Sequence, residues 1–229
     1  MKSLKKIVAL TGAGISAESG ITTFRDSGGL WEQYDVMEVA SIDGWHKNPQ
    51  LVQRFYNDRR KQLGEVEPND AHLILAELEK NFDVTVVTQN VDNLHERAGS
   101  TKIIHLHGEL TKVRSSIDPS LIIDIGHRPV ACDEKAPDGS QLRPHIVWFG
   151  EAVPLIETAA NVVAEADILL IIGTSLNVYP AAGLVEYANR KASIFLIDPN
   201  EVTYSGRNIT MIREKATIGM KKLIELLIQ

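Results

Sequence analysis

Residues 6–20 read KIVALTGAGISAESG, a short apolar run that ends in a cluster of small residues. The run Lys6–Leu10 has the length and apolar character of a buried strand. Gly12 and Gly14 follow at once, and glycines here let the chain turn sharply and let a pyrophosphate approach backbone N–H groups at a helix start. The stretch therefore predicts a strand–turn–helix unit that binds a dinucleotide. Its spacing is not G-x-G-x-x-G, so an ordinary tight turn between strand and helix remains the alternative at this point.

Similar apolar runs recur along the chain and alternate with segments of helical period. The further predicted strands are Val84–Thr88, Ile103–His105, Ile168–Ile172 and Ser193–Ile197. The predicted helices are Asn48–Leu63, Asn69–Lys80, Leu155–Ala166, Ala181–Lys191 and Ile218–Ile228. Apolar strands that alternate with helices favour a parallel sheet covered by helices on both faces. We therefore expect an α/β fold with a Rossmann-like, doubly wound parallel sheet.

Two stretches interrupt this alternation. Residues 24–69 are helical and loop-like, whereas residues 109–143 are polar and rich in turn residues. Because both lie between predicted strands, we expect them to form a smaller second lobe made from insertions. Residues 1–23, 70–108 and 144–229 then form the Rossmann-like domain. A cleft between the two lobes is the expected ligand site.

Composition excludes several classes of protein. The 229 residues carry 24 basic and 30 acidic groups, a net charge of -6 with no long basic tract, which argues against a nucleic-acid partner. Residues 1–6 lead into an apolar segment too short for a signal peptide or a membrane span, so no membrane association is expected. Cys132 is the single cysteine and forms no internal disulfide, which is consistent with a reducing compartment. We expect a cytoplasmic protein.

Further motifs follow the first turn in a fixed order. They are TTFR at 22–25 with GGLW at 28–31, TQNVDNLH at 88–95 and LHGE at 106–109. Together with GAGISAESGI at 12–21, they match the sirtuin motifs G-A-G-I-S-x-x-S-G-I, F-R, T-Q-N-x-D-x-L-H and H-G. Four long motifs in the family's order are a highly specific signal. The chain therefore resembles the sirtuin family.

The resemblance covers essentially the whole chain, because PHIVWFGE at 144–151, GTS at 173–175 and VYPAA at 178–182 also match. It implies an NAD-dependent protein-lysine deacylase whose partners are acyl-lysine-containing proteins or peptides. The larger domain is then the NAD-binding domain. The products implied are free lysine, nicotinamide and O-acyl-ADP-ribose.

The resemblance also assigns residues to NAD. The glycine-rich loop holds the pyrophosphate, Gln89 binds the ribose, and Asn90 and Asp92 suit the nicotinamide carboxamide, which presents both a donor and an acceptor. The complete set implied is Gly12, Ala13, Gly14, Ile15, Ser16, Ala17, Phe24, Arg25, Trp31, Gln89, Asn90, Val91, Asp92, Gly173, Thr174, Ser175 and Ala216. An asparagine usual in the family near the next strand end is replaced by Leu196-Ile197-Asp198, which leaves one adenosine contact undecided.

His107 is the catalytic base that the resemblance implies, with Asn90 and Asp92 as the other catalytic residues. The acyl-lysine carbonyl oxygen attacks the ribose, and His107 then takes a proton from a ribose hydroxyl. Histidine suits this step because its ordinary pKa lies near neutrality. Taken alone, a histidine at a strand end is more often a core or capping residue, and His95 and His105 keep that interpretation.

Tyr56 and Arg59 lie three residues apart and therefore on one face of the predicted helix. A phenol hydroxyl and an arginine fork bind a carboxylate at the end of an acyl chain. They match the Tyr-x-x-Arg pattern of class III sirtuins, bacterial CobB-like enzymes included, which remove succinyl and malonyl groups. We expect deacetylation as well. Without the family, a solvated face for Arg59, Arg60 and Lys61 is the better interpretation.

The remaining substrate contacts are also implied by the resemblance. Ala40 is the small residue that widens the acyl pocket, and two segments of the chain hold the peptide between them as an added strand. The complete substrate-binding set is Ala40, Tyr56, Arg59, Val147, Phe149, Gly150, Glu151, Val178 and Tyr179.

The chain departs from the family at the structural zinc. Sirtuins usually carry two Cys-x-x-Cys pairs in the small lobe, but Ser115 and Asp118 occupy the first pair, and Cys132 and Lys135 the second. Hydroxyl and ammonium groups are poor zinc ligands. We expect no structural zinc and a zinc-ribbon remnant within residues 109–143. A substitute site formed by Asp118, His127 and Cys132 is the alternative.

Two other functions use the same cofactor pocket. An NAD-dependent protein ADP-ribosyltransferase needs the pocket but no acyl channel. A non-catalytic sensor of NAD or ADP-ribose needs neither the base nor the channel, and the intact Asn90, Asp92 and His107 argue against it.

Overall fold

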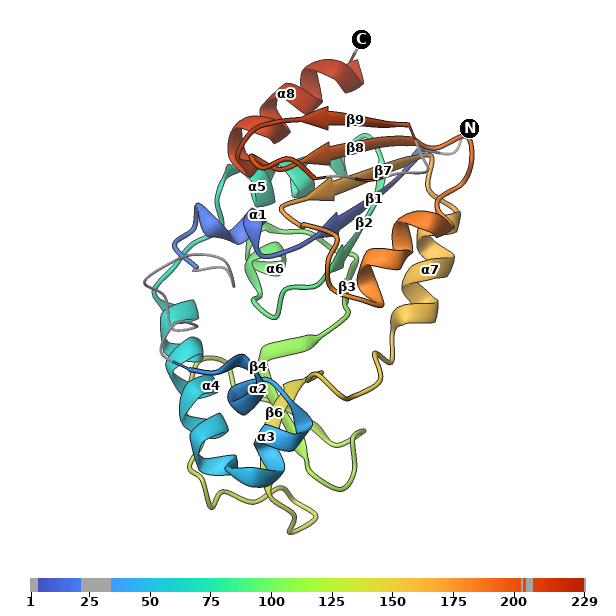
Figure 1. Ribbon diagram of the computed structural model, residues 1–229. Coiled ribbons are helices and arrows are strands. Elements are labelled where there is room, and N and C mark those ends of the chain that lie inside the picture. Colours follow the sequence, from blue (N-terminus) through green and yellow to red (C-terminus); the bar gives the residue numbers. More distant parts are fainter. Residues whose placement is uncertain (1–3, 22–33, 203, 205–207, 229) are drawn as a thin grey trace.

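The larger part of the molecule is a six-stranded parallel sheet. The computed structural model describes residues 4–21, 34–202, 204 and 208–228. The strands are β1 (Lys6–Thr11), β2 (Asp83–Thr88), β3 (Ile103–His105), β7 (Ile168–Ile172), β8 (Ser193–Ile197) and β9 (Ile209–Ile212). Their order is β3-β2-β1-β7-β8-β9, and every neighbouring pair is parallel (Figure 1). This is the Rossmann strand order, which confirms the predicted α/β fold.

Helices cover both faces of this sheet. Helices α5 (Asp70–Leu78) and α8 (Ala216–Ile228) pack on one face, and α7 (Ile156–Ala164) with the 3₁₀ helix η2 (Ala181–Tyr187) on the other. Because successive side chains of a strand point to opposite faces, Ile7 joins the first core and Val8 the second. Both faces of the sheet are covered by helices, which is why β1 is an almost continuous run of apolar residues.

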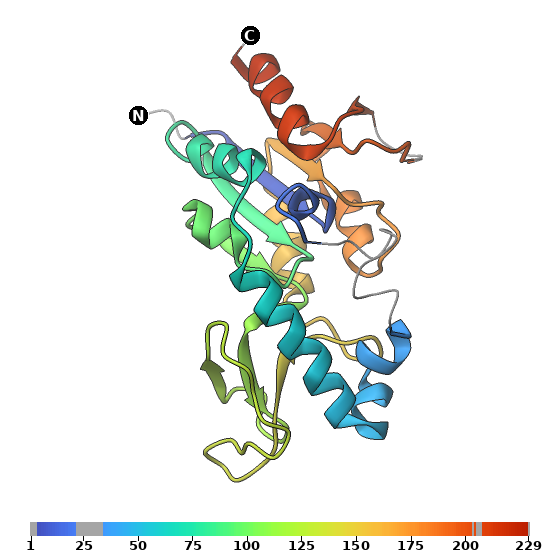
Figure 2. The ribbon, with the colours of Figure 1, turned by 90° about the vertical axis from the view of Figure 1, so that its left-hand side faces the viewer.

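A second, smaller part contains an antiparallel sheet of order β5-β4-β6. Its strands are β4 (Gly108–Ser115), β5 (Ile122–Asp124) and β6 (Leu142–Ile146), and its helices are α2 (Val36–Val39), α3 (Ile42–Lys47) and α4 (Pro49–Gly64). Figures 1 and 2 show these elements together, away from α8, with α4 running beside β4 and β6. Strand β6 crosses the domain boundary that we predict after Arg143.

Hydrogen bonds centred on Ser115 connect the loops where the family places its zinc. The Ser115 hydroxyl accepts from the backbone N–H groups of Ile117 and Asp118 and donates to the Asp138 carboxylate. It also lies 2.8 Å from the Ser140 hydroxyl, and the Ser115 side chain is buried. Thus Ser115 ties together the two loops at which cysteine thiolates are usual. That the lobe carries no structural zinc stays a prediction.

We expect Ser115→Ala to lower the free energy of unfolding by about 1–3 kcal/mol, because the variant loses a buried hydroxyl that bonds to the N–H groups of Ile117 and Asp118 and to the Asp138 carboxylate. Thermal denaturation with and without a chelator measures this, and the chelator should leave the wild-type Tm unchanged. Ser120→Ala is the matched control: Ser120 is exposed and donates only to Asp118, so its effect should stay within about 0.5 kcal/mol. One zinc per purified chain, lost together with stability in the chelator, would contradict the account.

Candidate active site

Two turns meet at the carboxyl end of the central strands β1 and β7. Gly12 donates to the carbonyl of Ile172, and Gly14 to the carbonyl of Gly173. A Cβ on Gly14 would lie 2.6 Å from the Gly173 Cα, and Gly173 itself has a φ of +62°. No larger residue fits here, because the two backbones are in direct contact. The strand order reverses between β1 and β7, and ligands of open α/β sheets bind at such a point.

Helix α1 (Gly14–Ala17) is only four residues long. The sequence favours an anion bound at a helix start, but so short a helix has little dipole, so backbone N–H groups are the relevant feature. Those of Gly12, Gly14, Ile15 and Ser16 all donate within the protein. The Ala13 N–H donates to no described residue and is the free donor of this turn.

The loop after β2 lies against the first turn. Asn90 is buried, and its Nδ2 donates to the Gly12 carbonyl at 3.1 Å and to the Ser16 hydroxyl at 3.2 Å. Gln89 donates from Nε2 to the Thr174 hydroxyl at 3.1 Å, which joins this loop to the turn after β7. Residues far apart in the sequence are therefore held together at one edge of the sheet.

Asp92 ends a directed chain of hydrogen bonds. The Asn69 N–H donates to His72 Nδ1, so the His72 ring carries its hydrogen on Nε2, 3.4 Å from the Ser16 hydroxyl. Ser16 in turn donates to Asp92 Oδ2 at 3.0 Å. Burial lowers the pKa of His72 to about 4, which keeps this ring neutral, and burial raises the pKa of Asp92. Sequence reasoning missed His72 because no motif contains it.

His107 follows β3 and is half-buried. Its Nδ1 lies 2.9 Å from the Gln89 carbonyl oxygen, which can only accept, so Nδ1 carries the hydrogen and Nε2 the lone pair. Burial lowers the pKa of His107, although the bond to Gln89 opposes this. A neutral imidazole with a free Nε2 is the form that acts as a base.

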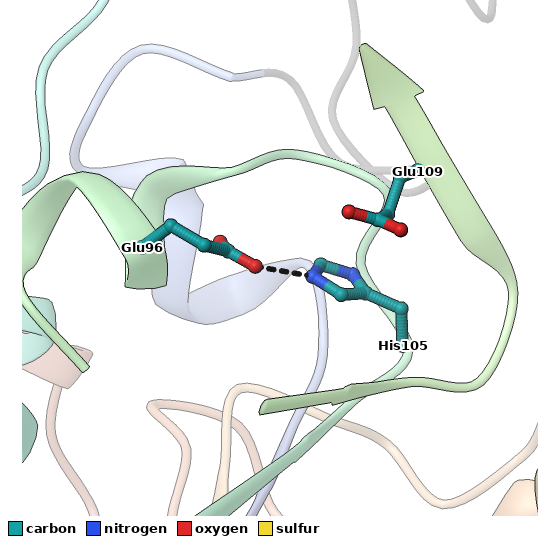
Figure 3. Close-up of side chains that lie close together, drawn as sticks. All are labelled: Glu96, His105 and Glu109. Atoms are coloured by element: carbon teal, nitrogen blue, oxygen red, sulfur yellow. Dashed lines mark hydrogen bonds and ion pairs between the residues drawn. The ribbon is translucent and has the colours of Figure 1, made fainter. Parts of the chain in front are cut away.

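Glu96, His105 and Glu109 form a cluster beside this loop. Their ligand atoms lie within 4.8 Å of one another, and Figure 3 shows Glu96 from α6 (Leu94–Ala98) and Glu109 from β4 approaching the His105 ring. His105 Nε2 lies 2.7 Å from Glu96, and Nδ1 lies 3.1 Å from the Asn90 carbonyl. Burial alone lowers the His105 pKa, but Glu96 and Glu109 outweigh it and the pKa is raised. We interpret the cluster as an ion-pair network in which His105 supports the Asn90 loop.

Among the described residues, Asp118, His127 and Cys132 do not form such a group of metal ligands. Cys132 is half-buried, His127 is exposed, and the Asp118 carboxylate accepts from Ser120. The alternative of a substitute metal site in the small lobe gains no support from this arrangement.

Tyr56 and Arg59 lie on one face of α4, as their spacing predicts. Tyr56 is 2% exposed, its hydroxyl accepts from Trp148 Nε1 at 2.9 Å, and burial raises its pKa to about 12. Arg59 is half-buried, and burial lowers its pKa, although the charges of Tyr56 and Asp92 oppose this. Arg60, in contrast to the solvated alternative, is fully buried, and its guanidinium donates to Asn57.

Ala40 and Phe149 are joined through their backbones. The Phe149 N–H donates to the Ala40 carbonyl at 2.9 Å, and the Phe149 carbonyl accepts from Ile42 at 3.0 Å. The backbone of Phe149 is therefore not free to pair with a peptide. Its side chain is exposed, as are Val178 and Tyr179. The N–H of Gly150 donates to no described residue and remains available.

The Glu151 carboxylate bonds within the protein. It accepts from both Nη atoms of Arg143, at 2.8 and 2.9 Å, and from the Trp148 N–H at 2.9 Å. Arg114 lies 3.4 Å away. We therefore assign the Glu151 side chain a role in shaping the turn at residues 148–151. That the Glu151 segment contacts the substrate peptide stays a prediction.

The other predicted residues occupy varied positions. Ile15 and Ala216 are buried in the core between the sheet, α5 and α8, and Ser16 is fully buried. Ala13, Gly14, Ala17, Val91, Val147, Gly173 and Ser175 are half-buried around the two turns and the neighbouring loops. Phe24, Arg25 and Trp31 lie outside the described residues.

Comparison with known proteins places this geometry in a family. The model of the Sir2 family matches residues 12–180, which include both turns, the Asn90 loop and His107. The chain belongs to the Sir2 family. A relative from Bacteroides thetaiotaomicron named NAD-dependent protein deacylase is 60% identical over 98% of this chain and 99% of its own length.

Solved structures of Sir2 proteins share the fold. A Sir2 homolog in complex with NAD superposes with a TM-score of 0.88 at 39% identity, covering 98% of this chain and 90% of that one. A Sir2 protein bound to an acetylated peptide has a TM-score of 0.81 at 28% identity, covering 97% and 93%. In the part of this Sir2 chain that the structure describes, no helix combines the length and apolar character needed to cross a membrane.

Proposed function

We propose that this Sir2 protein is an NAD-dependent protein-lysine deacylase that removes succinyl and malonyl groups and also acetyl groups. Membership of the family and the name of the Bacteroides relative support the general reaction. The observation that carries the proposal is the position of His107, whose Nδ1 bonds to the Gln89 carbonyl. Asn90 follows Gln89 in the sequence, and its side chain donates to Gly12 and Ser16, so the base and the glycine-rich turn are connected.

The described residues fit NAD as co-substrate. The Ala13 N–H lies between Gly12 and Gly14, which carry no side chains, and it donates to no described residue, so it suits a pyrophosphate oxygen. The Asn90 amide oxygen makes no hydrogen bond to a described residue, so it is free for a carboxamide N–H. Bound NAD supplies an electrophilic ribose carbon when nicotinamide departs. Buried Asn90 and Asp92 would orient that carboxamide and keep water out.

His107 acts as the base. With Nδ1–H held by the Gln89 carbonyl, the lone pair on Nε2 would be available to accept the proton of a ribose hydroxyl of bound NAD and so activate that hydroxyl toward the acyl carbon. Burial keeps the ring neutral before the transfer. The ring returns to the neutral form when the proton leaves for the departing lysine amine or for water.

The acyl preference follows from α4. Arg59 supplies a fork of N–H donors and Tyr56 a neutral phenol, and both suit a terminal carboxylate. Ala40, with its small side chain, leaves room for the longer acyl chain. A peptide would lie between Gly150 and the exposed segment Val178–Tyr179, held mainly through its backbone.

Incubation with NAD and a succinyl-lysine peptide tests the general reaction. A deacylase releases nicotinamide only when peptide is present and forms O-acyl-ADP-ribose in equal amount. Nicotinamide released without peptide, together with ADP-ribose attached to protein, would instead favour the transferase. Acetyl-, malonyl- and succinyl-lysine on one peptide sequence then rank the acyl groups.

We expect the pH dependence of kcat/KM to follow the ionisation of His107. Only the neutral base is active, and its pKa in the free enzyme lies below the ordinary 6.5 because the ring is buried. Activity should therefore rise with pH, reach half its maximum below pH 6.5 and stay level above that value. An acetyl-lysine peptide is the substrate of choice, because it has no titrating carboxylate. An acid limb with its midpoint above pH 7 would contradict the assignment.

A further inference from the structure

The Tyr56 hydroxyl has a partner that the Tyr-x-x-Arg pattern does not include. Trp148 donates from its indole Nε1 to the Tyr56 oxygen at 2.9 Å, and each side chain is only 2% exposed. The rings are in contact as well, with centroids 6.1 Å apart. The two residues are 92 positions apart in the sequence, so only the fold brings them together.

This bond fixes the direction of the Tyr56 hydroxyl hydrogen. Indole N–H is a donor only, so the phenol oxygen is the acceptor and its own hydrogen must point elsewhere. Burial raises the pKa of Tyr56 to about 12, so the hydrogen is present at neutral pH. No described residue accepts it. The charges that act on the Tyr56 pKa belong to Arg59, Arg143 and Glu151. The two guanidinium groups are donors only, and the Glu151 carboxylate accepts from Arg143 and from the Trp148 N–H.

The buried Tyr56 O–H has no acceptor among the described residues, and Arg59 is a cation on the same face of α4. An anion is the ligand that suits both groups. Leaving such a donor unpaired is unfavourable, and a carboxylate accepts from the phenol and from the arginine together. A neutral methyl group satisfies neither donor. The site therefore distinguishes acidic acyl groups from acetyl in two ways: by the positive charge of Arg59 and by the orientation of the Tyr56 hydroxyl.

Trp148 is itself held firmly. The Arg143 guanidinium lies 3.7 Å from the Trp148 ring centroid, and Glu151 binds both Arg143 and the Trp148 backbone N–H. Trp45 packs on the same ring, with centroids 5.3 Å apart. A rigid donor of this kind restricts the phenol to one hydrogen-bonding direction without loss of entropy on binding.

We infer that Trp148 is a specificity-determining positioning residue, which directs the Tyr56 hydroxyl hydrogen toward the carboxylate of a succinyl or malonyl group. The inference rests on the proposed function, since it concerns how the same site selects its acyl group. Trp148 acts through Tyr56 and requires no contact of its own with the carboxylate.

Trp148→Phe tests the inference, because phenylalanine keeps an aromatic ring and loses the indole N–H. The ratio of kcat/KM on succinyl-lysine to that on acetyl-lysine should fall about tenfold, the size of one hydrogen bond to a charged group. The loss should appear in KM for the succinyl peptide more than in kcat. Tyr56→Phe should lower the same ratio, and adding Trp148→Phe to it should change the ratio less than about twofold, since both substitutions remove one interaction.

Trp45→Phe is the matched control. It removes an indole from the same aromatic cluster but not the bond to Tyr56, so the ratio should be preserved even if stability falls. An equal loss on both substrates in Trp148→Phe, or full additivity with Tyr56→Phe, would overturn the inference while leaving the deacylase intact. A wild-type enzyme with no preference for succinyl- or malonyl-lysine would instead overturn the proposed acyl class.

Discussion

We expect His107→Ala to lower kcat/KM for deacylation by about 10²–10⁴-fold, the usual contribution of a general base. The imidazole is half-buried, neutral and oriented by the Gln89 carbonyl, so a substitute base would have to reach the position of its Nε2. His105 cannot do so, because both of its ring nitrogens bond to Asn90 and Glu96. Initial rates of nicotinamide release with a fixed acyl-lysine peptide give the size of the loss.

The control for this variant is His127→Ala, since His127 is exposed in the small lobe and lies outside the proposed site. Its rates should match the wild type within about twofold, as for other surface substitutions. NAD binding by the His107→Ala protein should persist, because the turns and the Asn90 loop keep their contacts. Wild-type turnover in His107→Ala would remove the proposed mechanism.

The second large effect concerns Arg59→Met. Loss of the guanidinium should lower kcat/KM on succinyl-lysine by about 100-fold, because a bidentate charged pair in a buried site is strong. The loss on acetyl-lysine should be much smaller, since acetyl has no carboxylate. Methionine keeps an unbranched apolar stem but loses the guanidinium, whose carbon lies 5.9 Å from the Phe55 ring centroid; the acetyl-lysine rate of the same variant accounts for any loss of packing.

Two further variants separate charge from geometry. Arg59→Lys keeps the charge but loses the planar fork, and should fall between wild type and Arg59→Met. Arg54→Met removes a cation from the exposed side of the same helix and should leave the preference for succinyl-lysine unchanged. A proportional loss on both substrates in Arg59→Met would refute the carboxylate clamp.

Much of the larger sheet is predictable from the sequence, because its central strands are short, buried and almost entirely apolar. The ranges Ile103–His105, Ile168–Ile172 and Ser193–Ile197 are confirmed residue for residue. Strand β9 was missed because, in this four-residue edge strand, only Ile212 is buried. The helix predicted for Ala181–Lys191 is a shorter 3₁₀ helix that ends at Tyr187.

The small antiparallel sheet was harder to predict. Strand β4 has its charged residues, Glu109, Lys112 and Arg114, at half-buried positions between buried ones, and a register shift between Gly108 and Val113 interrupts strict alternation. Its alternation of Leu110 and Val113 with charged residues was the available signal. The stretch around β5 is mostly loop, which hides a three-residue strand within turn residues.

In the candidate site, too, some residues could be predicted from the sequence and others could not. Residues within the motifs, such as Asn90 and His107, could be named from the sequence, because each motif is local. His72 and Trp148 could not be assigned a role, since their contacts with Ser16 and Tyr56 span 56 and 92 residues. Buried Arg60 was missed for a similar reason: only the fold shows that it turns inward to the Leu110 carbonyl.

A structure of this Sir2 protein with NAD and an acyl-lysine peptide tests the central claim most directly. The account predicts a pyrophosphate oxygen at the Ala13 N–H and His107 Nε2 within hydrogen-bonding distance, about 3 Å, of a ribose hydroxyl. An imidazole that faces away from the ribose, or a cofactor bound outside the two turns and the Asn90 loop, would contradict it.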